Sequence, residues 1–304
     1  MLQPKPEWLT VVPPTAVDDK GKNYKRLKGI FKELGLHTVC EEAHCPNVSE
    51  CWGSGTATLM LMGDVCSRAC RFCMVTPGKP TRAPDPLEPE NVALTLSNMG
   101  LGYVVLTSVD RDDLPDQGAG HFAKTIRETK KMNPKMRIEV LIPDFQNDVD
   151  LIRTVVEAGP DVIAHNIETT MFLSERVRDP RAGYWQSLSV LRTIKKLDSS
   201  MPTKSSIMLG LGEKEEEVRL AMMHLKEAGV NFFTLGQYLR PSARHLPVLE
   251  YVPPGVFDHY RQVGEEEFGF DYVASGPLVR SSYRAGELFI EAKLKERHTT
   301  INEL

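Results

Sequence analysis

Short runs of apolar, β-branched and aromatic residues alternate with longer amphipathic segments along residues 56–275. The short runs predict strands, and the segments between them have the 3.6-residue spacing of helices. Such alternation is typical of a parallel sheet with right-handed crossovers. The pattern predicts the α/β class, and a full or partial (β/α) barrel fits it better than an open sheet. The predicted strands are Thr56–Met62, Gly102–Thr107, Met136–Ile142, Asp161–His165, Thr203–Leu209, Asn231–Leu235 and Asp271–Ser275.

Three segments carry clear helix signals. Asn147–Ala158 has its apolar residues at helical spacing, ends before a glycine, and has Asn147 as the candidate N-cap. Glu213–Ala228 has acids in its first turn and also ends before a glycine, as the helix dipole and the left-handed C-terminal cap favour. Tyr24–Leu34 has apolar residues at helical spacing with basic residues between them. We therefore predict a helix in each of these segments.

The composition excludes several classes of protein. The 304 residues include 37 Lys plus Arg and 41 Asp plus Glu, for a formal net charge of −4. This charge argues against broad electrostatic binding of nucleic acid or of an anionic membrane. No apolar run approaches the roughly 18 residues of a membrane span, and no secretory signal is apparent at the start. We expect a cytoplasmic protein that binds neither nucleic acid nor a membrane.

All six cysteines lie within residues 40–73, in two triplets. Clustered cysteines in a reducing compartment are more often metal ligands or catalytic groups than disulfides. The second triplet is Cys66-x3-Cys70-x2-Cys73, directly after the first predicted strand. Three thiolates on one loop can hold three irons of a 4Fe–4S cluster, which leaves the fourth iron free to chelate S-adenosylmethionine and to pass it an electron. The alternatives are a zinc site or three buried cysteines, although zinc needs a fourth ligand nearby.

The first triplet, Cys40-x4-Cys45-x5-Cys51, leaves two interpretations open. Three soft ligands within twelve residues can bind a second iron–sulfur cluster, again with one iron that lacks a cysteine. Alternatively, His37 or His44 could complete a Cys3His zinc site. The spacing of the residues does not decide between them.

From about Asn23 to Glu287 the chain resembles the lipoyl synthase family of radical S-adenosylmethionine enzymes. The most specific signals are the two triplets together with the sequence RSSY at Arg280–Tyr283. Gln117 stands where the family often has glycine, and His44 where it often has a small residue; neither is an expected ligand. Further similar blocks are Leu106–Phe122, His165–Thr169, Lys204–Glu213 and Gly236–Val248.

The resemblance implies a fold, a domain organisation and a set of ligands. The fold would be a partial (β/α)6 TIM-type barrel of the radical SAM type over residues 56–275, between an N-terminal extension, 1–55, and a tail, 276–304. In this family Cys66, Cys70 and Cys73 would hold the 4Fe–4S cluster that cleaves S-adenosylmethionine. An auxiliary 4Fe–4S cluster would take Ser282 as its fourth protein ligand, and a serine oxygen is a harder, more easily released ligand than a thiolate. The other three ligands of the auxiliary cluster would be Cys40, Cys45 and Cys51.

The resemblance also implies an activity and partners. Two sulfur atoms would be inserted at C6 and C8 of an octanoyl chain on a lysine of a lipoyl-carrier domain, with two S-adenosylmethionine molecules and sulfur from the auxiliary cluster. The carriers would be E2 subunits of 2-oxoacid dehydrogenases and the glycine cleavage H protein, and a low-potential donor would supply electrons. The alternatives are another sulfur-inserting radical enzyme, of biotin-synthase or methylthiotransferase type, or a non-catalytic zinc-binding interaction protein.

The cofactor S-adenosylmethionine should bind at the C-terminal ends of the barrel strands. The residues at strand ends that suit it are Thr107, Asn166, Glu168 and Lys204.

Overall fold

The computed structural model describes residues 4–10, 56–99 and 101–282, together with the single positions 29, 37, 38, 47 and 285. All but one position of the predicted helix Tyr24–Leu34 lies outside the described residues. No helix among the described residues is both long enough and apolar enough to pass through a lipid bilayer.

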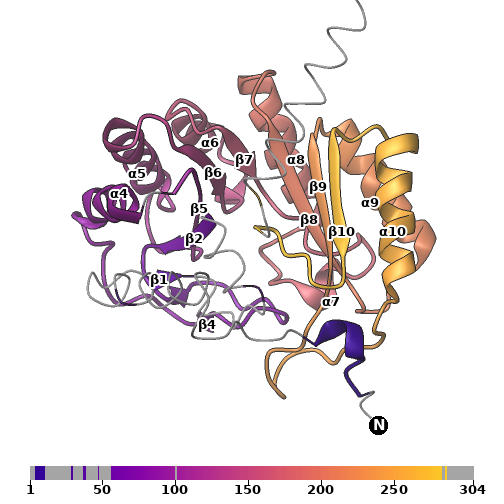
Figure 1. Ribbon diagram of the computed structural model, residues 1–304. Helices are drawn as coiled ribbons and strands as arrows, with labels where there is room; N and C mark the ends of the chain where they lie inside the picture. Colours follow the sequence, from indigo (N-terminus) through magenta and orange to yellow (C-terminus); the bar gives the residue numbers. More distant parts are fainter. Residues whose placement is uncertain are drawn as a thin grey trace, which may run out of the picture.

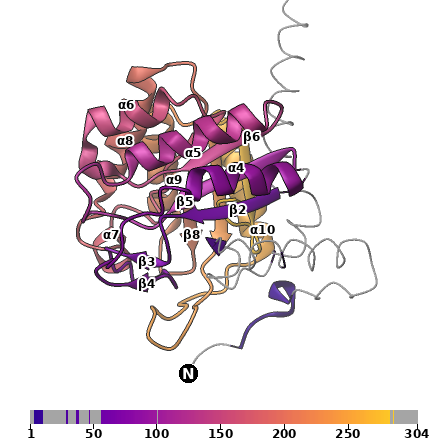
Figure 2. The same cartoon turned by 90° about the vertical axis from the view of Figure 1, so that its left-hand side faces the viewer.

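The core of the structure is a curved sheet with helices on its outer face (Figures 1 and 2). Its strand order is β1-β2-β5-β6-β7-β8-β9-β10. β1 pairs antiparallel with β2, and every later pair is parallel. Neighbours in this sheet are thus consecutive along the chain, as in a barrel. The strands are β1 (His37–Thr38), β2 (Thr56–Leu61), β5 (Tyr103–Ser108), β6 (Arg137–Leu141), β7 (Val162–Ala164), β8 (Thr203–Leu209), β9 (Phe232–Gln237) and β10 (Tyr272–Gly276).

Six helices cross between successive parallel strands in the described residues, so six β/α units precede β10. This confirms the predicted partial barrel, and every predicted strand is present within two residues of its predicted ends. A two-stranded sheet, β3 (Val65–Cys66) with β4 (Thr76–Pro77), lies beyond the end of β2. The crossing helices are α4 (Glu88–Met99), α5 (Ala119–Met132), α6 (Val149–Val156), α8 (Tyr184–Leu197), α9 (Glu215–Glu227) and α10 (Pro254–Gln262); the shorter helices are η1 (Glu7–Leu9), η2 (Phe145–Asn147), α7 (Ser174–Val177) and η3 (Val263–Glu267).

The N-cap of α6 differs from the prediction by one residue. Asp148, and not Asn147, caps the helix: its carboxylate accepts hydrogen bonds from the backbone N–H groups of Asp150 at 2.9 Å and of Leu151 at 3.3 Å. Asn147 has φ +65°, whereas an N-cap residue needs extended backbone, which Asp148 has. The turn η2 therefore moves the start of α6 by one position.

Apolar side chains fill the space between the parallel sheet and the helices that cover it. Leu59, Val104, Ile138 and Ile163 are 0–1% exposed and belong to one large apolar cluster with the inner faces of α4, α5 and α6. A second cluster joins β8, β9 and β10 to α8, α9 and α10. Strands that are buried on both faces consist of nearly continuous apolar runs, so they can be predicted from the sequence.

A buried polar triad interrupts this apolar interior. Lys204 Nζ donates to Glu139 Oε1 at 2.8 Å, and the Tyr103 hydroxyl donates to Glu139 Oε2 at 2.7 Å. The side chains of Lys204 and Glu139 are each 3% exposed. Tyr103 and Lys204 are the first and second residues of their strands, so the triad lies toward the N-terminal end of the barrel.

Candidate functional site

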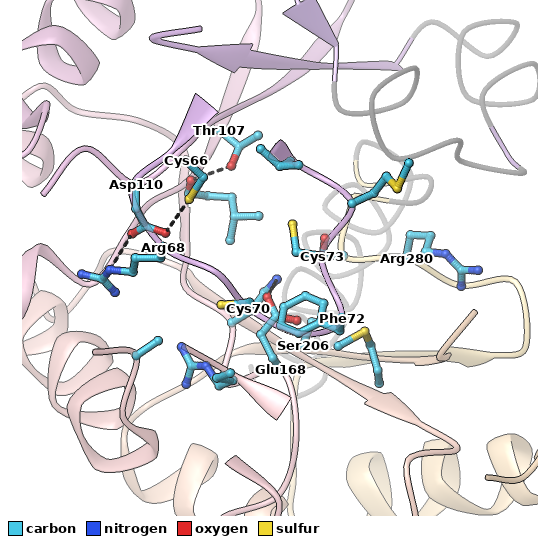
Figure 3. Close-up of a pocket in the computed structure, with 18 of the residues that line it drawn as sticks. Cys66, Arg68, Cys70, Phe72, Cys73, Thr107, Asp110, Glu168, Ser206 and Arg280 are labelled. Carbon is cyan, nitrogen blue, oxygen red and sulfur yellow. Dashed lines mark hydrogen bonds and ion pairs between the residues drawn. The ribbon is translucent and has the colours of Figure 1, made fainter. Parts of the chain in front are cut away.

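A cavity of about 740 Å³ lies at the opposite, C-terminal end of the parallel strands. Side chains from the ends of these strands and from the loops that follow them line it (Figure 3). This end of a (β/α) barrel is where the loops converge and where enzymes of this architecture place their active sites.

Three free thiols share the cavity. Cys66 belongs to β3, Cys70 and Cys73 lie on the turn between β3 and β4, and all three line the cavity. In Figure 3 their sulfur atoms face the same open space. Backbone hydrogen bonds hold this cysteine loop, residues 66–73: Ser67 N–H donates to the carbonyl of Asp110 at 2.9 Å, and Cys73 N–H donates to that of Cys70 at 3.1 Å.

The chemistry of these donors fits an iron–sulfur cluster. Burial raises the pKa of Cys66 and of Cys70 to about 12, and that of Cys73 to about 11. Thiols with such pKa values ionise only when a strong cation binds them, and iron supplies that charge. No three His, Cys, Asp or Glu side chains among the described residues are placed to share one metal ion. A 4Fe–4S cluster, by contrast, offers each thiolate an iron of its own.

A buried arginine ties the cysteine loop to two strand ends. Arg68 donates bidentately to Asp144, at 2.6 and 2.8 Å, and bidentately to Asp112, at 3.0 and 2.8 Å. Its side chain is 2% exposed. Burial alone would raise the pKa of Asp112 and of Asp144, but the hydrogen bonds from Arg68 hold both pKa values below the ordinary value. Both carboxylates are thus charged partners that fix Arg68, and with it the loop between Cys66 and Cys70.

A second clamp comes from residues 179–181. Asp179 Oδ2 accepts from the backbone N–H of Ala69 at 2.8 Å, and the backbone N–H of Asp179 points at Cys70 Sγ at 3.3 Å. Arg181 donates to Asp179 at 2.8 Å and to the carbonyl of Ser67 at 2.8 Å. Hydrogen bonds from Arg181 are the main reason that the pKa of Asp179 lies well below its ordinary range. Hydrogen bonds to sulfur also tune the reduction potential of iron–sulfur clusters.

Beside Cys66, one carboxyl group keeps an elevated pKa. Cys66 Sγ lies 3.6 Å from Asp110 Oδ2, and Asp110 also lies 3.6 Å from Arg68. Burial raises the pKa of Asp110 to about 6 despite that arginine. Figure 3 shows Asp110 between Cys66 and Arg68 at the edge of the cavity.

Three residues that line the cavity with the thiols have buried polar atoms without a partner in the described chain. Oδ1 of Asn166, Nε of Arg178 and Oγ of Ser108 are buried, and no residue of the described chain bonds them. Asn166 Nδ2 donates to Glu168 Oε1 at 3.1 Å, and burial raises the pKa of Glu168. Glu168 has φ +65°, a costly conformation for a residue with a side chain. Buried polar atoms normally have partners, so this group is suited to a polar ligand such as S-adenosylmethionine.

A neutral histidine positions Arg178. His165 Nδ1–H donates to the carbonyl of Ile142 at 2.9 Å, and its Nε2 accepts from the hydroxyl of Ser187 at 2.8 Å. Arg178 Nη1 donates to the same hydroxyl oxygen at 2.9 Å. Acceptance at Nε2 requires the neutral imidazole, and burial lowers the pKa of His165 to about 4.

This network predicts acid sensitivity. The unfolded chain binds a proton at His165 near the ordinary pKa of 6.5, whereas the folded chain resists it down to about 4. Stability is therefore present above pH 6.5 and is lost as the pH falls toward 4. From pH 8 to pH 5.5 we expect His165 to account for roughly 1 kcal/mol of lost stability. In urea titrations at the two pH values, His165→Gln should show a loss smaller by that amount, while His259→Gln on the surface should match the unsubstituted protein.

The residues predicted from sequence are only partly brought together. Thr107, Asn166, Glu168 and Ser282 line the same cavity as the three thiols, and Thr107 Oγ1 donates to the carbonyl of Leu141 at 3.0 Å. Lys204 does not line it, because it lies near the N-terminal end of β8; only its partner Glu139 reaches the cavity. The remaining predicted ligands, Cys40, Cys45 and Cys51, lie outside the described residues.

The sequence reasoning missed the two clamps. Arg68, Asp112 and Asp144 were not singled out, nor were Asp179 and Arg181 as partners of the cysteine loop. A signal was present, because Asp112 and Asp144 follow two predicted strands within a few residues. Acids after adjacent parallel strands meet at one edge of the sheet, where an arginine in the cysteine loop can reach them.

Comparison with known proteins agrees with this site. Residues 60–236 match the model of the radical SAM superfamily, and residues 4–45 match that of the N-terminal domain of lipoyl synthase of the radical SAM family. The crystal structure of HydG, a maturase of FeFe-hydrogenase, superposes with a TM-score of 0.57 at 16% identity, over 84% of this chain and 55% of that one, so the chain spans about half of it. The fold and the thiol cavity thus define a radical SAM enzyme, a class that works with a 4Fe–4S cluster and S-adenosylmethionine.

Similarity to curated proteins gives the particular family. The lipoyl synthase of Halobacterium salinarum is 56% identical over 296 residues, which cover 96% of this chain and 93% of that protein. The lipoyl synthase of an Anaeromyxobacter species is 55% identical over 297 residues, which cover 98% of this chain and 99% of that protein. This chain belongs to the lipoyl synthase family.

Proposed function

We propose that this protein inserts two sulfur atoms, at C6 and C8, into an octanoyl chain carried on a lysine of a lipoyl-carrier domain. Two S-adenosylmethionine molecules would be consumed, and the sulfur would come from an auxiliary 4Fe–4S cluster held by Cys40, Cys45, Cys51 and Ser282. When bound, the cluster on Cys66, Cys70 and Cys73 supplies the electron that turns S-adenosylmethionine into a hydrogen-abstracting radical. The carriers would be E2 subunits and H protein, with a low-potential electron donor.

The single observation that carries the proposal is the composition of the cavity. Three thiols, unpaired polar atoms of Asn166 and Arg178, and Ser282 meet in one space. The polar atoms suit S-adenosylmethionine, and apolar residues of the same wall suit an alkyl chain, which gains nothing from polar contacts. A bound alkyl chain on this apolar wall would displace water from its C6 and C8 positions, which no side-chain base could activate. The apolar part of the wall includes Met60, Val75, Val105, Leu141, Ile142 and Met208.

A contact between distant segments supports the position of the auxiliary cluster. Asn47 Nδ2 donates to the carbonyl of Leu278 at 2.5 Å. Asn47 lies between two cysteines of the first triplet in the sequence, and Leu278 lies four residues before Ser282. The tail, residues 276–282, thus runs close to Asn47, which belongs to the first triplet's part of the sequence. We accordingly propose three functional parts, 1–55, 56–275 and 276–304.

Anaerobic turnover tests the function directly. The reconstituted protein should be incubated with S-adenosylmethionine, a reductant and a peptide that carries octanoyl-lysine, and the products should be weighed by mass spectrometry. We expect two carbon–sulfur bonds per octanoyl chain, and little product from free octanoate, because the remote peptide contributes binding energy that positions the chain. Release of 5′-deoxyadenosine without sulfur on any peptide would contradict the proposal.

The role of Ser282 predicts a difference between two adjacent serines. Ser281 and Ser282 both line the cavity, so Ser281→Cys is a matched control. Ser282→Cys should retain the auxiliary cluster but insert sulfur at least about tenfold more slowly, because a thiolate holds iron more firmly than an alkoxide does. Iron content and single-turnover sulfur insertion measure both effects. Equal rates for the two variants would show that Ser282 is not a ligand of the cluster.

A further inference from the structure

Two segments that are far apart in sequence place three arginines at the cavity. Arg71 belongs to the cysteine loop, and Arg240 and Arg244 belong to the loop that follows β9; all three line the cavity. The segments are joined directly: Leu246 N–H donates to the carbonyl of Arg71 at 3.3 Å, and His245 Nε2–H donates to that of Cys73 at 2.9 Å. We call Arg71, Arg240 and Arg244 the arginine rim.

No carboxylate in the part of the chain that the structure describes neutralises the arginine rim. No carboxylate of the described chain pairs with Arg71, Arg240 or Arg244, and the first and last of these are exposed. Arg240 donates to the carbonyl of His245 at 2.9 Å and to that of Ala243. These bonds hold the loop in shape but leave the positive charge in place.

The acidic residues beside the cavity, in contrast, have a charged partner. Three acids that follow β5 and β6 pair with Arg68 and so do not pair with the arginine rim: Asp110, Asp112 and Asp144. Positive charge without a partner therefore gathers on one side of the cavity, beside the cysteine loop and the end of β9. In Figures 1 and 2 the loop after β9, drawn in orange, projects from the same end of the molecule as β3 and β4. In a chain of net charge −4, a local cluster of unpaired arginines is a specific feature.

We propose that the arginine rim docks carboxylate side chains that flank the acylated lysine on the carrier. This inference rests on the proposed function and adds the chemistry by which the carrier is recognised. An acyl-lysine arm that enters the cavity must leave the carrier backbone at its entrance, and the residues next to that lysine then meet the rim. Guanidinium groups bind carboxylates through two parallel hydrogen bonds and steer acidic surfaces toward them.

Two peptides and three variants test the docking. Each peptide carries octanoyl-lysine, flanked by glutamates in one and by glutamines in the other. The test variant is Arg71→Gln with Arg244→Gln, and Arg240 is left unchanged because it shapes its loop. Arg71→Lys with Arg244→Lys retains the charge. Arg127→Gln on the outer helix α5, also an exposed arginine, is the control. Binding of labelled peptide to the reconstituted protein is measured by anisotropy at low and at moderate salt, beside KM for sulfur insertion.

The expected result is specific to charge. The Gln double variant should bind the acidic peptide about three- to tenfold more weakly, as the loss of two solvent-exposed ion pairs implies. Its binding of the neutral peptide should be unchanged, and the Lys variant should retain most of the affinity. Added salt should weaken binding of the acidic peptide to the unsubstituted protein and to Arg127→Gln, and should affect the Gln variant little.

Two outcomes would overturn the docking proposal. One is an equal loss of affinity for both peptides by the Gln variant. It would show that the arginines bind a group inside the cavity, such as the carboxylate of S-adenosylmethionine, and not the carrier. The other is unchanged binding of the acidic peptide by the Gln variant. Failure of the proposed function would give a different result. Neither peptide would then gain sulfur, although the measured binding of the acidic peptide could still depend on the arginine rim.

Discussion

Replacement of Cys70 by alanine should abolish formation of 5′-deoxyadenosine, whereas replacement of Cys45 by alanine should abolish sulfur insertion and leave that formation measurable. Cys70 belongs to the thiols of the cavity, and its loss removes a ligand from the cluster that delivers the electron. Cys45 belongs to the first triplet, for which the lipoyl synthase family implies a second cluster. We expect the rate of each affected step to drop at least about 10³-fold, because the variant loses the cluster that takes part in that step and not merely a contact to it.

Iron analysis gives the matching control. The unsubstituted protein should hold about eight irons, and each variant about four, because one cluster of four is lost in each case. Circular dichroism should show that both variants keep their fold. If both folded variants lose 5′-deoxyadenosine formation to the same extent, the division of labour between the triplets is wrong. A colourless, iron-free protein that binds zinc would refute both assignments.

The second large effect concerns Arg68. Arg68→Met should lower the free energy of unfolding by about 3–5 kcal/mol, because it leaves the buried carboxylate of Asp144 without a counter-charge and leaves Asp112 with Arg181 alone. It should also release the cluster on the cysteine loop, because Arg68 joins that loop to the ends of β5 and β6. Urea unfolding and the rate of iron loss to a chelator measure the two effects.

The molecule supplies a matched control for this variant. Lys204 forms a buried ion pair with Glu139 at 2.8 Å, toward the N-terminal end of the barrel; Lys204 itself does not line the cavity, although Glu139 does. Lys204→Met should destabilise the protein by a similar amount, because it also leaves a buried carboxylate unpaired. Its iron should be lost no faster than in the unsubstituted protein below the unfolding transition. Equally fast iron loss in both variants would show that Arg68 acts only through global stability.

The case of Lys204 shows how far sequence reasoning reached and where it stopped. Its strand, Thr203–Leu209, was predicted with the correct ends. Its second position in that strand could have signalled the N-terminal end of the barrel, where ligands do not bind. Asn166 and Glu168 follow the end of β7, and they do line the cavity.

The sequence by itself determined the parallel sheet and the cysteine loop, because each depends on periodicity or on spacing within a short stretch. The six β/α units and the family followed from the resemblance of its motifs to a known family. Only the tertiary structure decided which charges meet. Arg68 finds Asp112 and Asp144 at separations of 44 and 76 residues, and Arg71 meets the loop of Arg240 and Arg244. Such pairs carry no local pattern, because desolvation and ion pairing act through space and become defined only when the sheet has brought the loops together.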